Sequence, residues 1–435
     1  MMFRVFWLLF LLFISFLNAS RPNEKTIGEN PPRHKKRDFI DGDMLLNDEQ
    51  RAMLFGSHEQ RKKRQIYRLS TKWDNNTLRY DYHPQLPQYT KIIVQEAMRY
   101  ISSRTCIKFK RVYNENSIFV QIFTGDGCYA DVGMKGNGNK NLQELSLGVG
   151  CERFETAVHE IMHALGVMHT HQRSDRDDYI YVQAEGSSDR AQFIKFPTTQ
   201  TEIAVPYEYG SVMHYAENSF NAVIRPKKYG FISTMGSRRV TFYDMVNINK
   251  HYQCGCPTPI KCWYGGYQNP SNCEKCVCPT GFGGSFCDRI DDNTDYALAW
   301  TNWTSASLTL KSDPGPLQAR YQTKTFIIIA AANAPIEIEI TEMSGFFESS
   351  GCNYSGVEIK YLGDPRITNP LHCSEANVTL AYKGKHTPMV ISLYSRLPAH
   401  YKPVIFGFRY RFVGGFLSVM HKRGTNGYDD YQYYL

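Results

Sequence analysis

The segment that most constrains the fold is eleven residues long and runs from His159 to His169. His159 and His163 are four residues apart, so on a helix both imidazoles leave the same face one turn apart and can bind one metal ion. Gly166 is expected to end this helix, because only glycine adopts a left-handed turn at little cost. The turn would bring His169 back as a third ligand. The pattern therefore predicts a helix that stops beside a metal site.

Three neutral imidazole nitrogens with one open position are typical of a catalytic zinc site, whereas a structural site is closed. Glu160 is expected beside the same helix face, within reach of a zinc-bound water, where its carboxylate can act as a general base. The alternative for a bare His-Glu-x-x-His is a surface histidine pair beside a solvated glutamate. Gly166 and His169 at the required offsets favour the catalytic site. We therefore predict one zinc ion per catalytic domain.

The start of the chain has the pattern of a secretory signal peptide, covering residues 1–20. Arg4 precedes an apolar run from Val5 to Leu17, and the small residues Ala19 and Ser20 follow. A membrane anchor is the alternative, but the run is short for a bilayer span and ends at a cleavage pattern. We expect a secreted, extracellular protein without a membrane anchor.

Residues 21–64 are polar and end in a basic tetrad, Arg-Lys-Lys-Arg, at positions 61–64. Such a tetrad can be a solvated loop, but here it follows a signal peptide and precedes the first globular pattern. We therefore predict a propeptide that a furin-like protease cleaves after Arg64. Asp41 and Asp43 flank a glycine in this segment, and a carboxylate there can occupy the fourth zinc position.

The net charge does not favour a nucleic-acid partner. The formal charge is +8, but residues 21–64 hold 11 basic and 8 acidic side chains, so with Arg4 they carry half of it. The remaining half is small and scattered.

Twelve cysteines in a secreted chain predict six disulfides rather than metal thiolates. Six of them lie within 32 residues, from Cys256 to Cys287, a segment too short to form a core without cross-links. Its closing half has the spacing of an EGF-like module. Four asparagines begin Asn-x-Ser/Thr acceptors for glycosylation, namely Asn75, Asn302, Asn353 and Asn377.

The globular pattern begins at Trp73, where short β-rich runs and helical repeats alternate. The metal helix is expected to start near Glu152 and to pack on a twisted sheet in a mixed α+β domain. Asp244 to Tyr252 is predicted as the last helix. Met213 can form an apolar floor beneath the zinc, and Tyr215 can bind the metal or donate a hydrogen bond to an oxyanion. On composition alone, Met213 would be an ordinary core residue and Tyr215 an ordinary aromatic residue.

Residues from about 290 to 415 are strand-rich, most clearly where apolar and acidic residues alternate from Ile336 to Ile340. The apolar run from Phe326 to Ala332 is predicted as a buried strand. Cys352 and Cys373 are expected to pair, and an antiparallel sandwich is the expected fold. The region contains no catalytic constellation.

The motifs at His159–His169 and Ser211–Tyr215, with this domain order, resemble the astacin family of zinc metalloendopeptidases in its EGF plus CUB architecture, as commonly found in nematodes. The resemblance implies a metzincin catalytic domain, a small EGF-like module and an all-β CUB-like sandwich. It assigns His159, His163 and His169 as zinc ligands, Glu160 as catalytic base, Met213 to the Met-turn, Tyr215 as switchable fifth ligand and Asp43 as the zymogen's zinc-capping aspartate. It also pairs Cys106 with Cys254, Cys128 with Cys151, Cys256 with Cys273, Cys262 with Cys276 and Cys278 with Cys287.

Three further positions bear on the family pattern. Arg238 matches an arginine that, in some members, lines the pocket after the scissile bond and selects acidic side chains. The alternative is a surface arginine beside Arg239. Thr170 stands where the family usually has a glutamate that anchors the new N-terminus. Ser355 replaces the aspartate of calcium-binding CUB domains, so no calcium site is predicted.

The predicted layout is a signal peptide (1–20), a propeptide (21–64), a zinc metalloprotease domain (65–255), an EGF-like module (256–288), a CUB-like domain (289–415) and a C-terminal tail (416–435). The predicted function is a secreted zymogen of a zinc metalloendopeptidase that hydrolyses internal bonds of extracellular or matrix proteins. Protein substrates, a furin-like activating protease and matrix partners of the EGF and CUB modules are the expected partners. The alternative is a catalytically decayed matrix-binding or adhesion protein.

Overall fold

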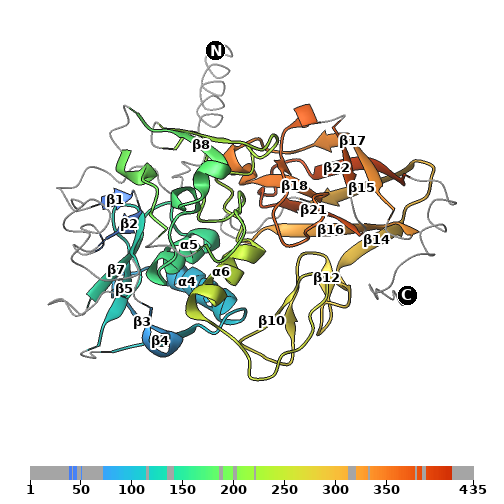
Figure 1. Ribbon diagram of the computed structural model, residues 1–435. Coiled ribbons are helices and arrows are strands. Elements are labelled where there is room, and N and C mark those ends of the chain that lie inside the picture. The colour runs from blue at the N-terminus through green and yellow to red at the C-terminus, as the bar shows by residue number, and fades with distance from the viewer. Residues whose placement is uncertain are drawn as a thin grey trace, which may run out of the picture.

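The computed structural model describes residues 39–41, 43–46, 50, 72–113, 117–134, 142–185, 190–198, 203–219, 222–311, 320–331, 334–377, 380–384 and 388–413. The predicted signal peptide, the cleavage site at Arg64 and the tail 416–435 lie outside these residues. Figure 1 shows a mixed α/β N-terminal domain on one side, a β-sandwich on the other and a small module below, between them. Within the described residues, no helix is long and apolar enough to cross a bilayer.

The N-terminal domain is built on a seven-stranded sheet of order β1-β2-β6-β7-β5-β3-β4. Most of its strands pair in parallel, and β6 runs antiparallel to β7. The two strands at one edge come from the predicted propeptide, and β2 pairs in parallel with β6. The strands are β1 (Phe39–Asp41), β2 (Met44–Leu45), β3 (Thr77–Tyr82), β4 (Lys108–Arg111), β5 (Phe119–Phe123), β6 (Cys128–Asp131) and β7 (Leu142–Leu147).

Two helices, α4 (Gln88–Ser102) and α5 (Phe154–Ala164), pack on this sheet and on each other. All eleven residues of α5 are buried. Its first residue is Phe154, two positions after the predicted start, because Arg153 is still extended at φ −133°. The end agrees with the prediction, since Gly166 adopts a φ of +92°.

The carboxyl end of α5 is held by side chains from both ends of the N-terminal domain. The indole Nε1 of Trp73 donates to the carbonyl of Ala164 (2.7 Å), and the Tyr252 hydroxyl donates to that of Leu165 (3.0 Å). The last carbonyls of a helix have no partner within it, so these bonds satisfy groups that burial would otherwise leave unpaired. The helix is thereby fixed along its axis.

The second half of the domain contains β8 (Ile180–Gln183), β9 (Val223–Pro226) and α6 (Phe242–Tyr252). Helix α6 begins two residues before the predicted Asp244. Thr241 is its N-cap, and the Thr241 side chain and Asp244 form a capping box. The prediction placed the capping aspartate at the helix start, whereas it is the third helical residue.

The small module consists of β10 (Tyr267–Gln268), β11 (Cys276–Val277), β12 (Phe282–Gly283) and β13 (Arg289–Ile290). Three disulfides hold it, and Phe282 packs with Ile327 and Val390 of the sandwich. Across the whole chain all twelve cysteines pair as Cys106–Cys254, Cys128–Cys151, Cys256–Cys273, Cys262–Cys276, Cys278–Cys287 and Cys352–Cys373.

The C-terminal sandwich packs a sheet of order β14-β16-β21-β18-β19 on one of order β15-β22-β17-β20. The predicted antiparallel sandwich has one exception among its strand pairs, because β14 pairs in parallel with β16. The strand between them in sequence, β15, lies in the other sheet and supplies the crossover that parallel neighbours require. The strands are β14 (Thr294–Leu298), β15 (Thr304–Leu310), β16 (Gln322–Ile329), β17 (Ile336–Ser344), β18 (Ser355–Lys360), β19 (Leu371–His372), β20 (Ala381–Gly384), β21 (Met389–Ser395) and β22 (Val404–Phe412).

One predicted glycosylation site is corrected by the fold. Asn353 is only 5% exposed, and its amide nitrogen donates to the carbonyls of Gly236 (3.1 Å) and Ser350 (2.7 Å). Its Oδ1 accepts the backbone N–H of Arg238 (2.7 Å). A glycan on this nitrogen would remove buried hydrogen bonds and would not fit between the packed domains. Asn75 and Asn302 are exposed, and the side chain of Asn377 lies outside the described residues.

Glycan mapping of the secreted protein is expected to find sugar on Asn75 and Asn302 and none on Asn353. Enzymatic release of N-glycans converts each used asparagine into aspartate, so peptide mass mapping reads every site separately. The two exposed sites act as internal controls for the glycosylation capacity of the expressing cell. Sugar on Asn353 in folded, secreted protein would contradict the packing described above.

Candidate active site

Helix α5 and the turn after it bring three imidazoles together. The Nδ1 of His159 lies 2.7 Å from the carbonyl of Val212, and the Nδ1 of His163 lies 2.8 Å from that of Val167. A carbonyl can only accept, so Nδ1 carries the proton and Nε2 keeps a lone pair for a metal. Burial lowers the pKa of His163 and of His169, which favours the neutral form that binds a cation.

Asp43 lies at the centre of this cluster. Its Oδ2 is 3.3 Å from the Nε2 of His159, and its Oδ1 is 3.2 Å from that of His169. Burial opposes its ionisation, but the interactions with His169 and His159 outweigh burial and hold the pKa of Asp43 well below its ordinary value. The ligand atoms of Asp43, His159, His163 and His169 all lie within 4.8 Å of one another. Three nitrogens and one carboxylate in that space fit a tetrahedral zinc ion.

Glu160 is fully buried, and neither of its carboxylate oxygens has a hydrogen-bond partner in the described part of the chain. Burial, and secondly the charge of Asp43, raise its pKa well above the ordinary value. Buried carboxylates are normally hydrogen-bonded, so an orphaned one beside a metal-binding cluster is typical of a group that acts on a substrate or water.

Tyr215 and Met213 lie on a turn that faces the cluster. The Tyr215 hydroxyl donates to Oδ1 of Asp43 (3.3 Å), and its ring stacks on His171 with centroids 4.1 Å apart. Met213 is 1% exposed and belongs to the same apolar core as α5. Its carbonyl accepts the N–H of Thr170 (2.9 Å), which joins this turn to the loop that carries His169.

Sequence reasoning missed the residue that anchors this turn. Asp244 of α6 is buried, and its carboxylate accepts the Ser211 hydroxyl (2.6 Å) and the N–H of Val212 (3.2 Å). Because the Val212 carbonyl orients His159, Asp244 supports a predicted zinc ligand through one intermediate residue. In the sequence, the spacing Thr241-x-x-Asp244 indicates a helix start. It gives no information about the other hydrogen bonds that the aspartate accepts.

Arg238 is 3% exposed, and its backbone N–H donates to Asn353 of the sandwich. A side chain so enclosed differs from the open pocket wall that the resemblance implies. Its role in selecting acidic substrates stays a prediction.

The comparisons with known proteins agree with this geometry. The family model described as Astacin, a family of peptidases, matches residues 65–253. "Zinc metalloproteinase nas-17" of Caenorhabditis elegans is 39% identical over 98% of this chain and 98% of that protein. The chain belongs to the astacin family. "Zinc metalloproteinase nas-16" of the same organism is also 39% identical, over 86% of this chain and 79% of its own length.

Among solved structures, the hatching enzyme zinc-protease High choriolytic enzyme 1 of Oryzias latipes is 30% identical. It covers 43% of this chain and 94% of its own, with a TM-score of 0.38. As an astacin-family member with the complete histidine set, the protein is a zinc metalloendopeptidase that acts on protein substrates.

Proposed function

We propose that the protein is a secreted zymogen which, once cleaved after Arg64, hydrolyses internal peptide bonds of extracellular or matrix proteins. The observation that carries this proposal is the buried carboxylate of Glu160, without a partner among the described residues, beside three histidines. A group that costs stability in this way is expected to be retained for chemistry rather than for packing.

His159, His163 and His169 would hold a zinc ion, which would supply Lewis acidity toward the scissile carbonyl and a water molecule. Glu160 takes a proton from the attacking water and returns it to the nitrogen of the leaving amine. The Tyr215 hydroxyl, which faces Asp43 in the zymogen, donates instead to the oxyanion of the tetrahedral intermediate.

Asp43 supports the zymogen part of the proposal. It belongs to the segment before Arg64, and the N–H of Ala130 donates to its carbonyl (2.8 Å), which fixes the residue on the catalytic sheet. Its carboxylate occupies the position that a substrate carbonyl and water need. Cleavage after Arg64 would free this segment to leave and open the site.

The alternative, a decayed protease that binds matrix through its EGF-like and CUB-like modules, is not favoured. All three zinc ligands, the general base and Tyr215 are present and lie together. The modules remain candidates for matrix contacts that deliver the protease to its substrate.

The proposal is tested with full-length secreted protein, before and after cleavage at Arg64, on an unfolded generic protein substrate. Processed protein is expected to cut the substrate, to stop when a zinc chelator is added and to recover when zinc is restored. Unprocessed protein is the matched control and should cut little. If processed, zinc-loaded protein cleaves nothing, the binding alternative replaces the protease.

A further inference from the structure

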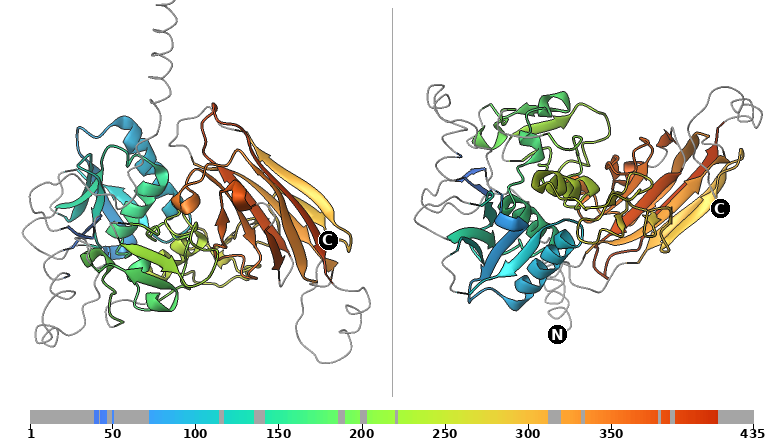
Figure 2. Two further views of the ribbon diagram at one scale, coloured as in Figure 1. Left: turned by 90° about the horizontal axis from the view of Figure 1, so that it is seen from above. Right: turned by 60° about the horizontal axis from the view of Figure 1, so that its bottom comes forward.

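The C-terminal sandwich is packed against the catalytic domain, and both views of Figure 2 show the two side by side. The contact is rich in hydrogen bonds between the two bodies. Thr234 accepts the N–H of Leu371 (2.9 Å), and Glu208 accepts that of Thr368 (3.0 Å). Glu208 is 3% exposed, so the interface excludes water from a carboxyl group. Such a contact is specific to one docking geometry.

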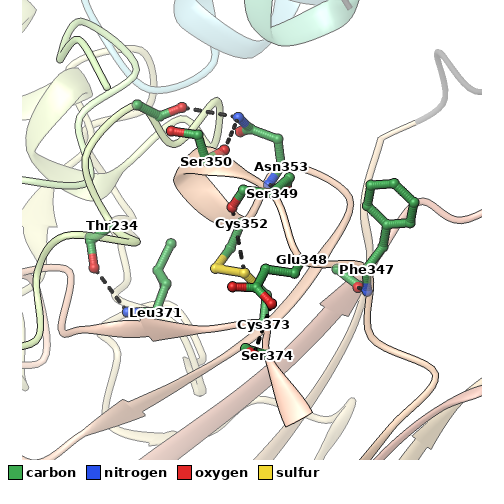
Figure 3. Close-up of a disulfide and its surroundings, with 12 residues drawn as sticks. Thr234, Phe347, Glu348, Ser349, Ser350, Cys352, Asn353, Leu371, Cys373 and Ser374 are labelled. Atoms are coloured by element: carbon green, nitrogen blue, oxygen red, sulfur yellow. Dashed lines mark hydrogen bonds between the residues drawn. A yellow bond between two sulfur atoms is a disulfide. The ribbon is translucent and has the colours of Figure 1, made fainter. Parts of the chain in front are cut away.

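One part of this interface is a loop tied by the Cys352–Cys373 disulfide, drawn in Figure 3. The loop holds Asn353 against the backbone of Gly236 and Arg238. Gly351 has a φ of +68°, and a Cβ there would lie 2.2 Å from the carbonyl oxygen of Gly236. The two backbones therefore approach as closely as glycine allows, which fixes the position of the sandwich.

The other part reaches the metal-binding helix itself. Arg396 of the sandwich forms an ion pair with Glu155, in the first turn of α5 and one turn before His159. The residues are 6% and 2% exposed. Within the described residues Arg396 is the one hydrogen-bond partner of the Glu155 carboxylate, whose second oxygen has none. The charge of Glu155 is thus balanced from another domain.

Tyr321 connects the two parts of the interface. Its hydroxyl donates to the carbonyl of Asn353 (2.8 Å), and the Arg396 guanidinium lies over its ring, 3.7 Å from the centroid. The guanidinium is therefore held between an aromatic face and a carboxylate, which restricts its position more than an ion pair alone would.

We propose that Arg396 is a positioning residue for the zinc-binding helix, and that the docked sandwich is thereby a working part of the protease site. Helix α5 is buried along its whole length, so it moves as a unit with His159 and Glu160. Without Arg396, the Glu155 carboxylate would be buried and unbalanced, and reaching water would require a shift of the first turn. A displacement of about 1 Å at a reacting group can cost on the order of a hundredfold in rate.

The test compares Arg396→Gln, Arg396→Lys, Glu155→Gln and the double variant Glu155→Gln/Arg396→Gln in processed full-length protein. Arg396→Gln is expected to lower kcat by about tenfold to a hundredfold with KM changed less than about threefold, and to weaken zinc retention against a competing chelator. Arg396→Lys should retain much of the kcat and zinc retention that Arg396→Gln loses. The double variant should have a higher kcat and better zinc retention than Arg396→Gln, because removing both charges leaves none unbalanced. If Arg396→Gln does not fold, the lysine and double variants carry the comparison.

Arg409→Gln is the matched control, because Arg409 pairs with Glu339 on the exposed face of the same sandwich. It should leave kcat and zinc retention unchanged. The proposal is overturned if the folded Arg396→Gln protein has a lower melting temperature but the same kcat and zinc retention as the unmodified protein. The inference rests on the proposed catalytic use of Glu160, but zinc retention is measured without turnover. If the unmodified enzyme were inactive, the proposed function would be refuted. The comparison of zinc retention between the variants could still be made.

Discussion

Replacing Glu160 with alanine is expected to lower kcat on a protein substrate by at least about 10² to 10⁴-fold while zinc remains bound. The residue supplies the proton transfers of the proposed mechanism but no ligand atom of the histidine set. Neither of its oxygens has a hydrogen-bond partner in the described structure, so the substitution breaks no bond that supports the fold. Removing a buried carboxyl group should leave the melting temperature unchanged or higher.

The measurement combines kcat with elemental analysis of zinc and a melting curve on the same processed protein. Glu274→Ala is a suitable control, because Glu274 is an exposed glutamate of the small module. Substantial cleavage by the Glu160→Ala protein would remove Glu160 from the mechanism. Loss of zinc together with activity would instead assign it a structural role at the site.

Replacing Asp43 with alanine is expected to give the unprocessed protein activity that its parent lacks. The Asp43 carboxylate contacts His159, His169 and the Tyr215 hydroxyl, so its removal opens the fourth metal position and frees the tyrosine. The segment would still be held on the sheet by the pairing of β2 with β6. Activity should therefore rise by about tenfold or more on short peptides, equivalent to about 1.4 kcal/mol of lost inhibition, and less on large proteins.

This prediction is measured with a quenched peptide on protein in which the basic tetrad is also altered to prevent cleavage. Asp41→Ala removes a neighbouring acid from the same segment and is the control. If the uncleaved Asp43→Ala protein is as inactive on the peptide as its parent, the inhibition comes from steric cover by the segment rather than from the carboxylate.

The parts of the site that depend on local spacing could be predicted from the sequence. His159 and His163 share a helix face at any α-helical geometry, and Gly166 is the residue that can turn the chain toward His169. The pairing partners of the cysteines followed from the family pattern. These inferences need only neighbours in sequence or a known arrangement.

The long-range contacts could not be predicted in this way. Arg396 and Glu155 are 241 residues apart, and each looks like an ordinary surface charge in sequence. Asn353 lies in a valid glycosylation motif, and only the docked sandwich shows that its amide is buried. Asp244 was placed in a helix, but its bonds to the turn at Ser211 depend on packing. Motif and periodicity carry no information about such partners.

The strand β2 has a consequence for how the mature enzyme would recognise its substrates. It covers β6 in this structure, and the N–H of Val132 just beyond β6 also donates to the Leu45 carbonyl (3.3 Å). If the predicted propeptide leaves after cleavage, β6 would become an open edge whose backbone groups need new partners. An extended peptide can supply them by adding a strand, whatever its side chains. The enzyme should then prefer cleavage points in loops and locally unfolded stretches, and helical segments should resist it until they unwind.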